Sequence, residues 1–405
     1  MGVGASAVAG ILALPSVVLP WVWTSLELPL LFVGLVIPLL QGGRLLGPLL
    51  LLPWVAGLSR RKWLITLSAS IMALTLLSLG LLLWSGRSSV AVIPVLLGLA
   101  LLAGIARGGA RFGYKEVLAR TLRREQRGSL LSRATSVGGW IALGAACLFH
   151  YLSGTYGKDE TEFLHILIGA GLWLAGGACF ALLFEPSSGS AISTRPRGAE
   201  LFRRGMQALR TKESLRRYTV LRMLLLSLDL AYPFYTVHAV AVHGTDGGLN
   251  LSLIVVFTSL ASILQGPVWG KRLDRSAQRS LVLAAFLASF AGILLLGVEA
   301  FAWMEFPVLH GIGLLLVSIA VQGGLNARNL YLVQIADEEE RPVVTAFTTT
   351  LSGIFGLVLA TVLGSLAHYR NITVVIAMLV LLQISVGFYA LRGGPVQNPG
   401  GAPEG

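Results

Sequence analysis

Three charged residues of this chain lie inside long apolar segments, where an ionisable side chain needs a specific partner. Arg44 lies midway along residues 29–56, Asp229 lies midway along residues 218–241, and Arg107 lies in a third such segment. A charge at the centre of a bilayer costs about 2.5–3.5 kcal/mol even on a lenient scale. We interpret the three residues as lining one water-filled cavity; a structural ion pair is the alternative for Arg44 and Asp229.

Asp229 is the candidate for proton chemistry, because it is the only carboxylate that the sequence places deep within an apolar segment. Binding a proton would remove its charge and let a cavity close. Pro233 frees a backbone carbonyl four residues earlier and is expected to bend this helix. Tyr232 and Tyr235 flank the proline and are candidate cavity or gate residues, although packing or anchoring at the membrane surface would also explain them.

Further polar residues follow the same segments. Arg107 and Arg111 lie four residues apart, on one face of a helix. Asn326 and Arg328 occupy the matching place in the second half of the chain, and we expect Asn326 to face the cavity. Arg111, Arg328 and Lys115 either join that cavity or extend along their apolar stems to the membrane surface.

The composition indicates a membrane protein. Apolar residues make up 55% of the 405 residues and charged residues only 12%, with a mean hydropathy of +0.77. Soluble domains carry about 25% charged residues. The apolar residues fall into blocks of roughly 18–25, the length that crosses about 30 Å of hydrocarbon as a helix. We therefore predict an all-α membrane protein.

Twelve membrane-spanning helices are predicted, at residues 4–24, 29–56, 64–84, 90–112, 135–152, 163–184, 218–241, 250–270, 280–298, 308–330, 344–367 and 372–391. The loops on one side contain most of the basic residues and those on the other only Arg87, Lys158 and Arg370. This positive-inside pattern places both termini in the cytoplasm. We expect the plasma (cell inner) membrane, and the net charge of +12 is explained by topology rather than by nucleic acid.

An internal repeat divides the spans into two sets of six. The stretch that begins Arg107-Gly108-Gly109 resembles the one that begins Gln322-Gly323-Gly324, about 215 residues later. A second pair lies at the end of the second span of each half, where Pro53-Trp54 and Pro267-Val268-Trp269 precede basic residues. A parallel repeat of this kind places a site between the halves, near the membrane midplane.

The predicted domains follow from this repeat. An N-terminal six-helix bundle occupies residues 1–184 and a C-terminal six-helix bundle occupies residues 218–392, so that the two are pseudo-symmetric. Residues 185–217 form a cytoplasmic linker whose part from Ala199 to Arg217 has the spacing of an amphipathic helix on the membrane surface. Residues 393–405 are rich in Gly and Pro and are expected to be disordered.

One short motif carries a resemblance to a known family. Gly270-Lys271-Arg272-Leu273-Asp274-Arg275, followed by Arg279, resembles the signature loop between helices 8 and 9 of the major facilitator superfamily, with Ala277 in place of the later Gly. The equivalent loop of the first half, Gly57-Leu58-Ser59-Arg60-Arg61-Lys62, has no acidic residue. The resemblance implies the major facilitator (MFS) fold and a gating loop formed by Gly57, Arg60, Arg61, Gly270, Asp274 and Arg275; ordinary positive-inside residues are the alternative.

The resemblance and the intramembrane charges together predict a secondary active transporter. It would move a small organic solute by alternating access, with protons as a candidate coupling ion and export as the favoured direction. Arg44 and Arg107 favour an anionic or amphipathic solute. Helix 5 has glycines but no proline, so the Gly-Pro signature of drug/proton antiporters is not present. A polytopic enzyme acting on lipids and a non-transporting receptor or scaffold are the alternatives.

The expected partners are the solute, membrane lipids and protons, and we expect a monomer. No phosphate-binding glycine loop and no nucleophile–base set stands out in the sequence, so we expect no enzyme activity and no cofactor. The histidines are dispersed in the sequence, mostly near the outer ends of spans, which argues against a metal site; they are His150, His165, His238, His243, His310 and His368.

Overall fold

The computed structural model describes residues 2–26, 28, 35–36, 38–44, 60, 62–85, 90–121, 124–185, 198–243, 251–301, 306–335 and 341–392. Every element of regular secondary structure within these ranges is a helix. Eleven stretches among them are long and apolar enough to cross a membrane. Most of the second predicted span, 29–56, lies outside the described residues, although residues 38–44 are helical.

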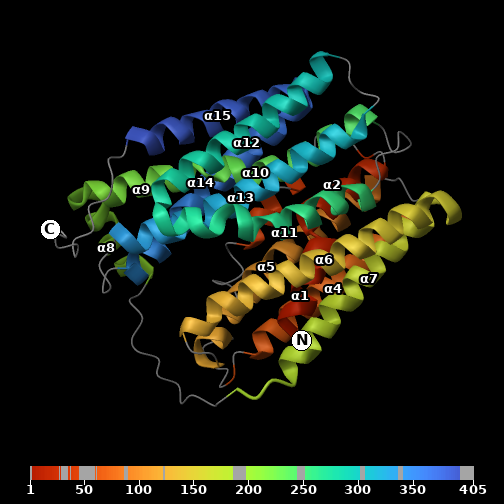
Figure 1. Ribbon diagram of the computed structural model, residues 1–405, viewed down its shortest axis with the longest axis horizontal. Coiled ribbons are helices and arrows are strands. Elements are labelled where there is room, and N and C mark those ends of the chain that lie inside the picture. Colours follow the sequence, from red (N-terminus) through yellow and green to blue (C-terminus); the bar gives the residue numbers. More distant parts are fainter. Residues whose placement is uncertain are drawn as a thin grey trace.

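The helices form two groups that follow each other along the chain (Figure 1). The first group comprises α1 (Gly2–Leu12), α2 (Pro15–Ser25), α4 (Lys62–Ser85), α5 (Ile93–Thr121), α6 (Arg124–Tyr156) and α7 (Lys158–Ala181). The second comprises α9 (Glu213–Leu224), α10 (Leu226–His243), α11 (Leu251–Arg275), α12 (Ala277–Ala300), α13 (Pro307–Ile335), α14 (Arg341–Tyr369) and α15 (Ile372–Arg392). A short 3₁₀ helix, η1 (Val90–Val92), precedes α5, and α8 (Gly198–Thr211) lies between the groups.

The two groups repeat the same packing, as the sequence repeat predicts. In the first group α4 packs against both α5 and α7, and in the second α12 packs against both α13 and α15. The helices α4 and α12 begin about 215 residues apart, as do α5 and α13. The structure therefore has the pseudo-symmetric six-plus-six arrangement of the predicted fold class.

The first span of each group is broken into two helices, which the sequence analysis did not predict. Leu14 separates α1 from α2 and is extended, with φ −68° and ψ 113°, because Pro15 disfavours a helical conformation at the residue before it. The boundary between α9 and α10 falls at Leu225, whose backbone remains helical, with φ −62° and ψ −14°. Pro233, where we expected the bend, lies inside the continuous helix α10.

Contacts between the two groups involve helices that lie far apart in the sequence. The helix α6 packs against α11, and α2 packs against α10. Small residues allow the first of these contacts, since a side chain at Gly139 would collide with Ile263. Further along α6, Ala142 and Ala146 form a buried apolar cluster with Val255. Large apolar residues such as Trp84 and Trp140 remain exposed on the outside, where a membrane would contact them.

The basic segment between the groups differs from its predicted form. The helix α8 ends at Thr211 and a second helix, α9, begins at Glu213, so residues 199–217 belong to two helices rather than one. The helix α8 packs against α14, where a side chain at Gly205 would overlap Phe347. The predicted domain boundaries remain a prediction.

One close backbone contact fixes the second span against the fourth. A Cβ atom built on Gly43 would lie 2.5 Å from the carbonyl oxygen of Leu101, and one built on Gly104 would lie 2.9 Å from the Cα atom of Gly43. The contact therefore needs glycine at both positions. It places Arg44, the next residue, beside α5.

We predict that Gly104→Ala destabilises the protein while Gly98→Ala on the same helix does not. A methyl group at Gly104 collides with backbone atoms, whereas one at Gly98 meets nothing within 4 Å. Overpacking costs about 1–3 kcal/mol, and a Gly to Ala change in an unobstructed helix gains about 0.5–1 kcal/mol. The midpoints of thermal unfolding in detergent should therefore move in opposite directions; equal midpoints would show that the contact is not tight.

Candidate substrate site

An ion pair connects the two halves near the centre of the molecule. The Nη2 atom of Arg44 lies 3.6 Å from the Oδ2 atom of Asp229, and each side chain is 17% exposed. Arg44 comes from the second span of the first half and Asp229 from α10 of the second half. The two residues singled out from the sequence are thus brought together, and their contact joins the moving parts of the predicted fold.

The local structure explains where each member of this pair lies. Arg44 follows the glycine that contacts α5, so its side chain begins at a fixed position next to that helix. Asp229 lies in the first turn of α10, four residues after Leu225, where α9 ends. A carboxylate is favoured at this place, because the first turn of a helix carries partial positive charge.

Three further arginines surround the pair. Arg107 lies within electrostatic range of Arg44, Arg111 and Asp229. Arg111 is exposed and lies within range of Arg44, Asp229 and Arg328. Arg328 in turn lies within range of Arg44 and Asp229. Four arginines therefore interact electrostatically with the single carboxylate of Asp229, and the site has an excess of positive charge.

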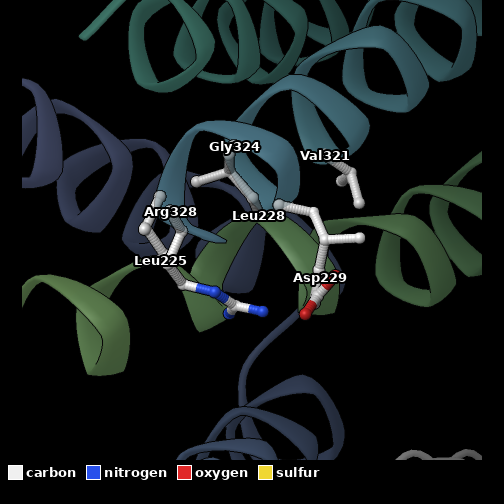
Figure 2. A pocket seen from close by; sticks show the side chains of 7 residues that line it. Leu225, Leu228, Asp229, Val321, Gly324 and Arg328 are labelled. Carbon is white, nitrogen blue, oxygen red and sulfur yellow. The ribbon is translucent and has the colours of Figure 1, made fainter. Parts of the chain in front are cut away.

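A small cavity of about 10 Å³ lies beside Asp229, which is about the room that one water molecule needs. Figure 2 shows that the guanidinium group of Arg328, from α13, and the carboxylate of Asp229, from α10, extend into this pocket toward each other. Leu225, Leu228 and Val321 give it an apolar wall (Figure 2). The Nε atom of Arg328 is buried and has no hydrogen-bond partner among the described residues, so the pocket contains a donor that a ligand could use.

A fifth arginine, Arg222, lies close to this cluster and was not singled out in the sequence analysis. It lies in α9, is only 9% exposed, and is within electrostatic range of Arg328. Its donors reach hydroxyl groups of neutral residues only, at 2.7–3.3 Å: those of Tyr218, Thr348, Thr349 and Ser352. The cluster of hydroxyl residues in α14 was a signal in the sequence for such a buried cation.

The other predicted cavity residues are dispersed. The hydroxyl of Tyr232 bonds to that of Ser318, and its ring lies within range of Arg107. Tyr235 is fully buried and packs against Gly292 of α12. Asn326 is exposed and does not line the pocket. The side chain of Lys115 lies outside the described part of the structure.

The predicted gating loop is only partly described. Gly57 and Arg61 lie outside the described residues, as does the side chain of Asp274, while Arg60 and Arg275 are exposed. The second copy is no loop, because residues 270–275 form the last turns of α11. A Cβ atom at Gly270 meets nothing within 4 Å, so the expected close helix approach does not occur there.

Two carboxylates, one buried and one half-buried, were missed because they lie near the ends of spans. Glu162 of α7 is 2% exposed and accepts a hydrogen bond of 2.7 Å from the indole of Trp21. Glu299 of α12 contacts His238 and Thr373. Each carboxylate lies inside one half of the protein and not among the arginines.

Comparison with known proteins agrees with this architecture. The sequence matches the Major Facilitator Superfamily over residues 1–358. Similar solved structures include the nucleoside transporter NupG (12% identity, 96% of this chain and 98% of that chain, TM-score 0.67), the xylose transporter XylE from E. coli (12%, 98% and 97%, 0.68) and the human organic anion transporter MFSD10 (16%, 96% and 97%, 0.54). No curated protein matches the chain in sequence. The matched family covers most of the chain and consists of transporters, so this protein is no enzyme but a multi-pass membrane transporter of the Major Facilitator Superfamily.

Proposed function

We propose that this protein is a secondary active transporter of small organic anions. The observation that carries the proposal is the excess of arginine around the contact between the halves. Arg44, Arg107, Arg111 and Arg328 lie within electrostatic range of one carboxylate, Asp229. Clustered charges of one sign that are partly removed from water need compensation, and a substrate with a carboxylate or phosphate group would supply it.

The chemistry of the guanidinium group suits such a substrate. Arginine presents planar pairs of donors that match carboxylate and phosphate oxygens, and these charge-assisted bonds are about twice as strong as neutral ones. Arg328 lines the pocket, and its buried Nε atom has no hydrogen-bond partner among the described residues. The apolar wall formed by Leu225 and Leu228 would contact the carbon skeleton of an organic anion.

The ion pair between the halves supplies a mechanism for alternating access. Arg44 and Asp229 belong to different halves, so their contact favours the conformation in which both approach each other. An anion that binds Arg44 would replace Asp229 and loosen this contact. A proton bound to Asp229 would have the same effect, which makes Asp229 the proposed site where substrate and coupling proton compete. The two halves would then rock about the site.

The fold alone does not select the substrate. The solved structures that resemble this chain include transporters of nucleosides, of xylose and of organic anions. All are less than 25% identical to it, so they support the fold and leave the substrate to the residues of the site. The positive charge of that site is what favours anions over neutral solutes.

We predict that the protein in proteoliposomes takes up di- and tricarboxylates or sugar phosphates in preference to nucleosides, free sugars and dipeptides. Arg107→Gln should reduce anion uptake about tenfold or more, because a hydrogen bond to a charged group contributes about 1.5–3 kcal/mol and 1.4 kcal/mol is a factor of ten. The measurement is uptake of radiolabelled solutes from such a panel.

The matched control for this experiment is Arg203→Gln. Arg203 is exposed on α8 and outside the arginine cluster, so anion uptake should remain at the wild-type level. Equal uptake of neutral and anionic solutes by the wild type, or an Arg107→Gln variant as active as Arg203→Gln, would contradict an anion site between the halves.

We further predict that Asp229→Asn abolishes the dependence of transport on a proton gradient while the protein stays folded. The amide keeps the shape of the side chain but binds no proton and pairs with no cation. Uptake with and without an imposed pH gradient measures this effect. Glu213→Gln, which removes an exposed ion pair with Arg217 on α9, is the control and should change little. Normal pH-dependent transport by Asp229→Asn would refute the role of Asp229.

A further inference from the structure

Three of the dispersed histidines meet in the folded protein and form one hydrogen-bonded chain with a glutamate. The Nε2 atom of His243 lies 2.8 Å from the Nδ1 atom of His310. The Nε2 atom of His310 lies 3.0 Å from the Nδ1 atom of His238, whose Nε2 atom lies 3.2 Å from the Oε2 atom of Glu299. We call these four residues the histidine chain.

The histidine chain lies at one end of the C-terminal half. His238 and His243 come from the last turns of α10, Glu299 from the last turn of α12, and His310 from the first turn of α13. This is the end of the bundle away from the predicted cytoplasmic loops. His238 and His310 are fully buried, whereas His243 is half-buried and the side chain of Glu299 is 32% exposed. Both ends of the chain therefore have access to solvent on the same side.

The bonding within the chain points to a proton rather than a metal ion as its ligand. Both ring nitrogens of His310 and of His238 are engaged with other members of the chain. No group of three or more His, Cys, Asp or Glu side chains that could hold a metal ion occurs among the described residues. Each hydrogen bond of the chain contains one hydrogen, which can be bonded to either of the two atoms that the bond joins.

We propose that the histidine chain is a proton-binding site that takes up one exchangeable proton from the outer side and shares it among its four members. With three neutral imidazoles and an ionised Glu299 the chain has a charge of −1, and one added proton makes it neutral. Burial favours the neutral state, because a net charge away from water is costly. The site is separate from Asp229 and does not depend on the proposed anion substrate.

The transfer of the proton accounts for every hydrogen that each nitrogen or oxygen atom gains or loses. In the first state each histidine has its hydrogen on Nε2 and donates toward Glu299. A proton added to Nδ1 of His243 lets each Nε2 hydrogen move one bond along, from His243 to His310, from His310 to His238, and from His238 to Oε2 of Glu299. Each histidine then has its hydrogen on Nδ1, and the protonated Glu299 donates back to His238. All three hydrogen bonds survive with reversed direction, so neither state leaves a buried nitrogen unpaired.

The neighbouring helices add little charge to this site. The helix α2, which packs against α10, contains no ionisable residue. From α15, Thr373 donates a hydrogen bond of 2.8 Å to the same Oε2 atom of Glu299. On α14 the ionisable groups near this end, His368 and Tyr369, contact each other. Within the described part of the chain, Glu299 is thus the one carboxylate that faces these imidazoles.

The proposal is tested by asking whether the four residues titrate as one unit, as interacting sites do. The full-length protein with ¹⁵N-labelled histidine is titrated in lipid bilayers, and the imidazole signals are followed by NMR. The carbonyl band of protonated Glu299 is followed by infrared difference spectroscopy and identified by its loss in Glu299→Gln. We expect the signals of the three histidines and the Glu299 band to change with one common midpoint.

Two variants complete the experiment. His310→Gln interrupts the chain and should split the common midpoint, so that the Glu299 band and the His243 signal titrate at different pH values. His150→Gln changes an exposed histidine of α6, outside the chain, and should leave the midpoint as in the wild type. Independent midpoints in the wild type, or a Glu299 band whose midpoint is the same in the wild type and in His310→Gln, would overturn the proposal. Neither readout needs a transported substrate, so failure here is distinct from failure of the anion proposal.

Discussion

An excess of positive charge at the contact between the two halves is the constraint on which the rest of this structure depends. Asp229 is within range of four arginines and can pair closely with one of them, which is Arg44 in this conformation. The remaining charge is tolerable only where water or an anion compensates it. A transporter that must bind and release an anion needs this incomplete compensation, because a fully neutralised site would have no affinity for the substrate.

The helices around the site are arranged to hold these charges in place. The contact between Gly43 and Gly104 places Arg44 beside the helix that carries Arg107. Asp229 lies in the first turn of α10, on the helix that follows the boundary with α9 at Leu225. On the same helix, nine residues further along, lies His238. At a rise of 1.5 Å per residue this separates Asp229 from the histidine chain by about 13 Å. One helix thus connects the two ionisable sites of the C-terminal half.

Much of the architecture could be predicted from the sequence, because membrane spans and repeats leave strong local patterns. The positions of the spans, the repeat and the family all follow from apolar blocks and paired motifs. The convergence of Arg44 and Asp229 could be predicted as well, since each charge lies far from a span end and needs a partner. The family profile and the structure agree with these inferences; the roles of the individual site residues remain predictions.

The features that were missed depend on packing between distant segments. The histidine chain joins residues that are 61 to 72 positions apart, and nothing in the local sequence around His238 or Glu299 indicates a partner. Arg222 directly follows a basic segment and was not singled out, yet hydroxyl groups of α14 bind it inside the bundle. The expected loop at Gly270 is helical, since α11 continues through Pro267 and Gly270 to Arg275 and the next helix begins only after Ser276.

The most direct test of the central claim is the affinity of the purified protein for the anion that it takes up fastest, measured by calorimetry for three proteins. If the anion and Asp229 compete for Arg44, then Asp229→Asn should bind the anion more tightly than the wild type, and Arg44→Gln should bind it less tightly. Changes of opposite sign are the predicted result. Weaker binding by Asp229→Asn, or the same affinity in all three proteins, would contradict the account.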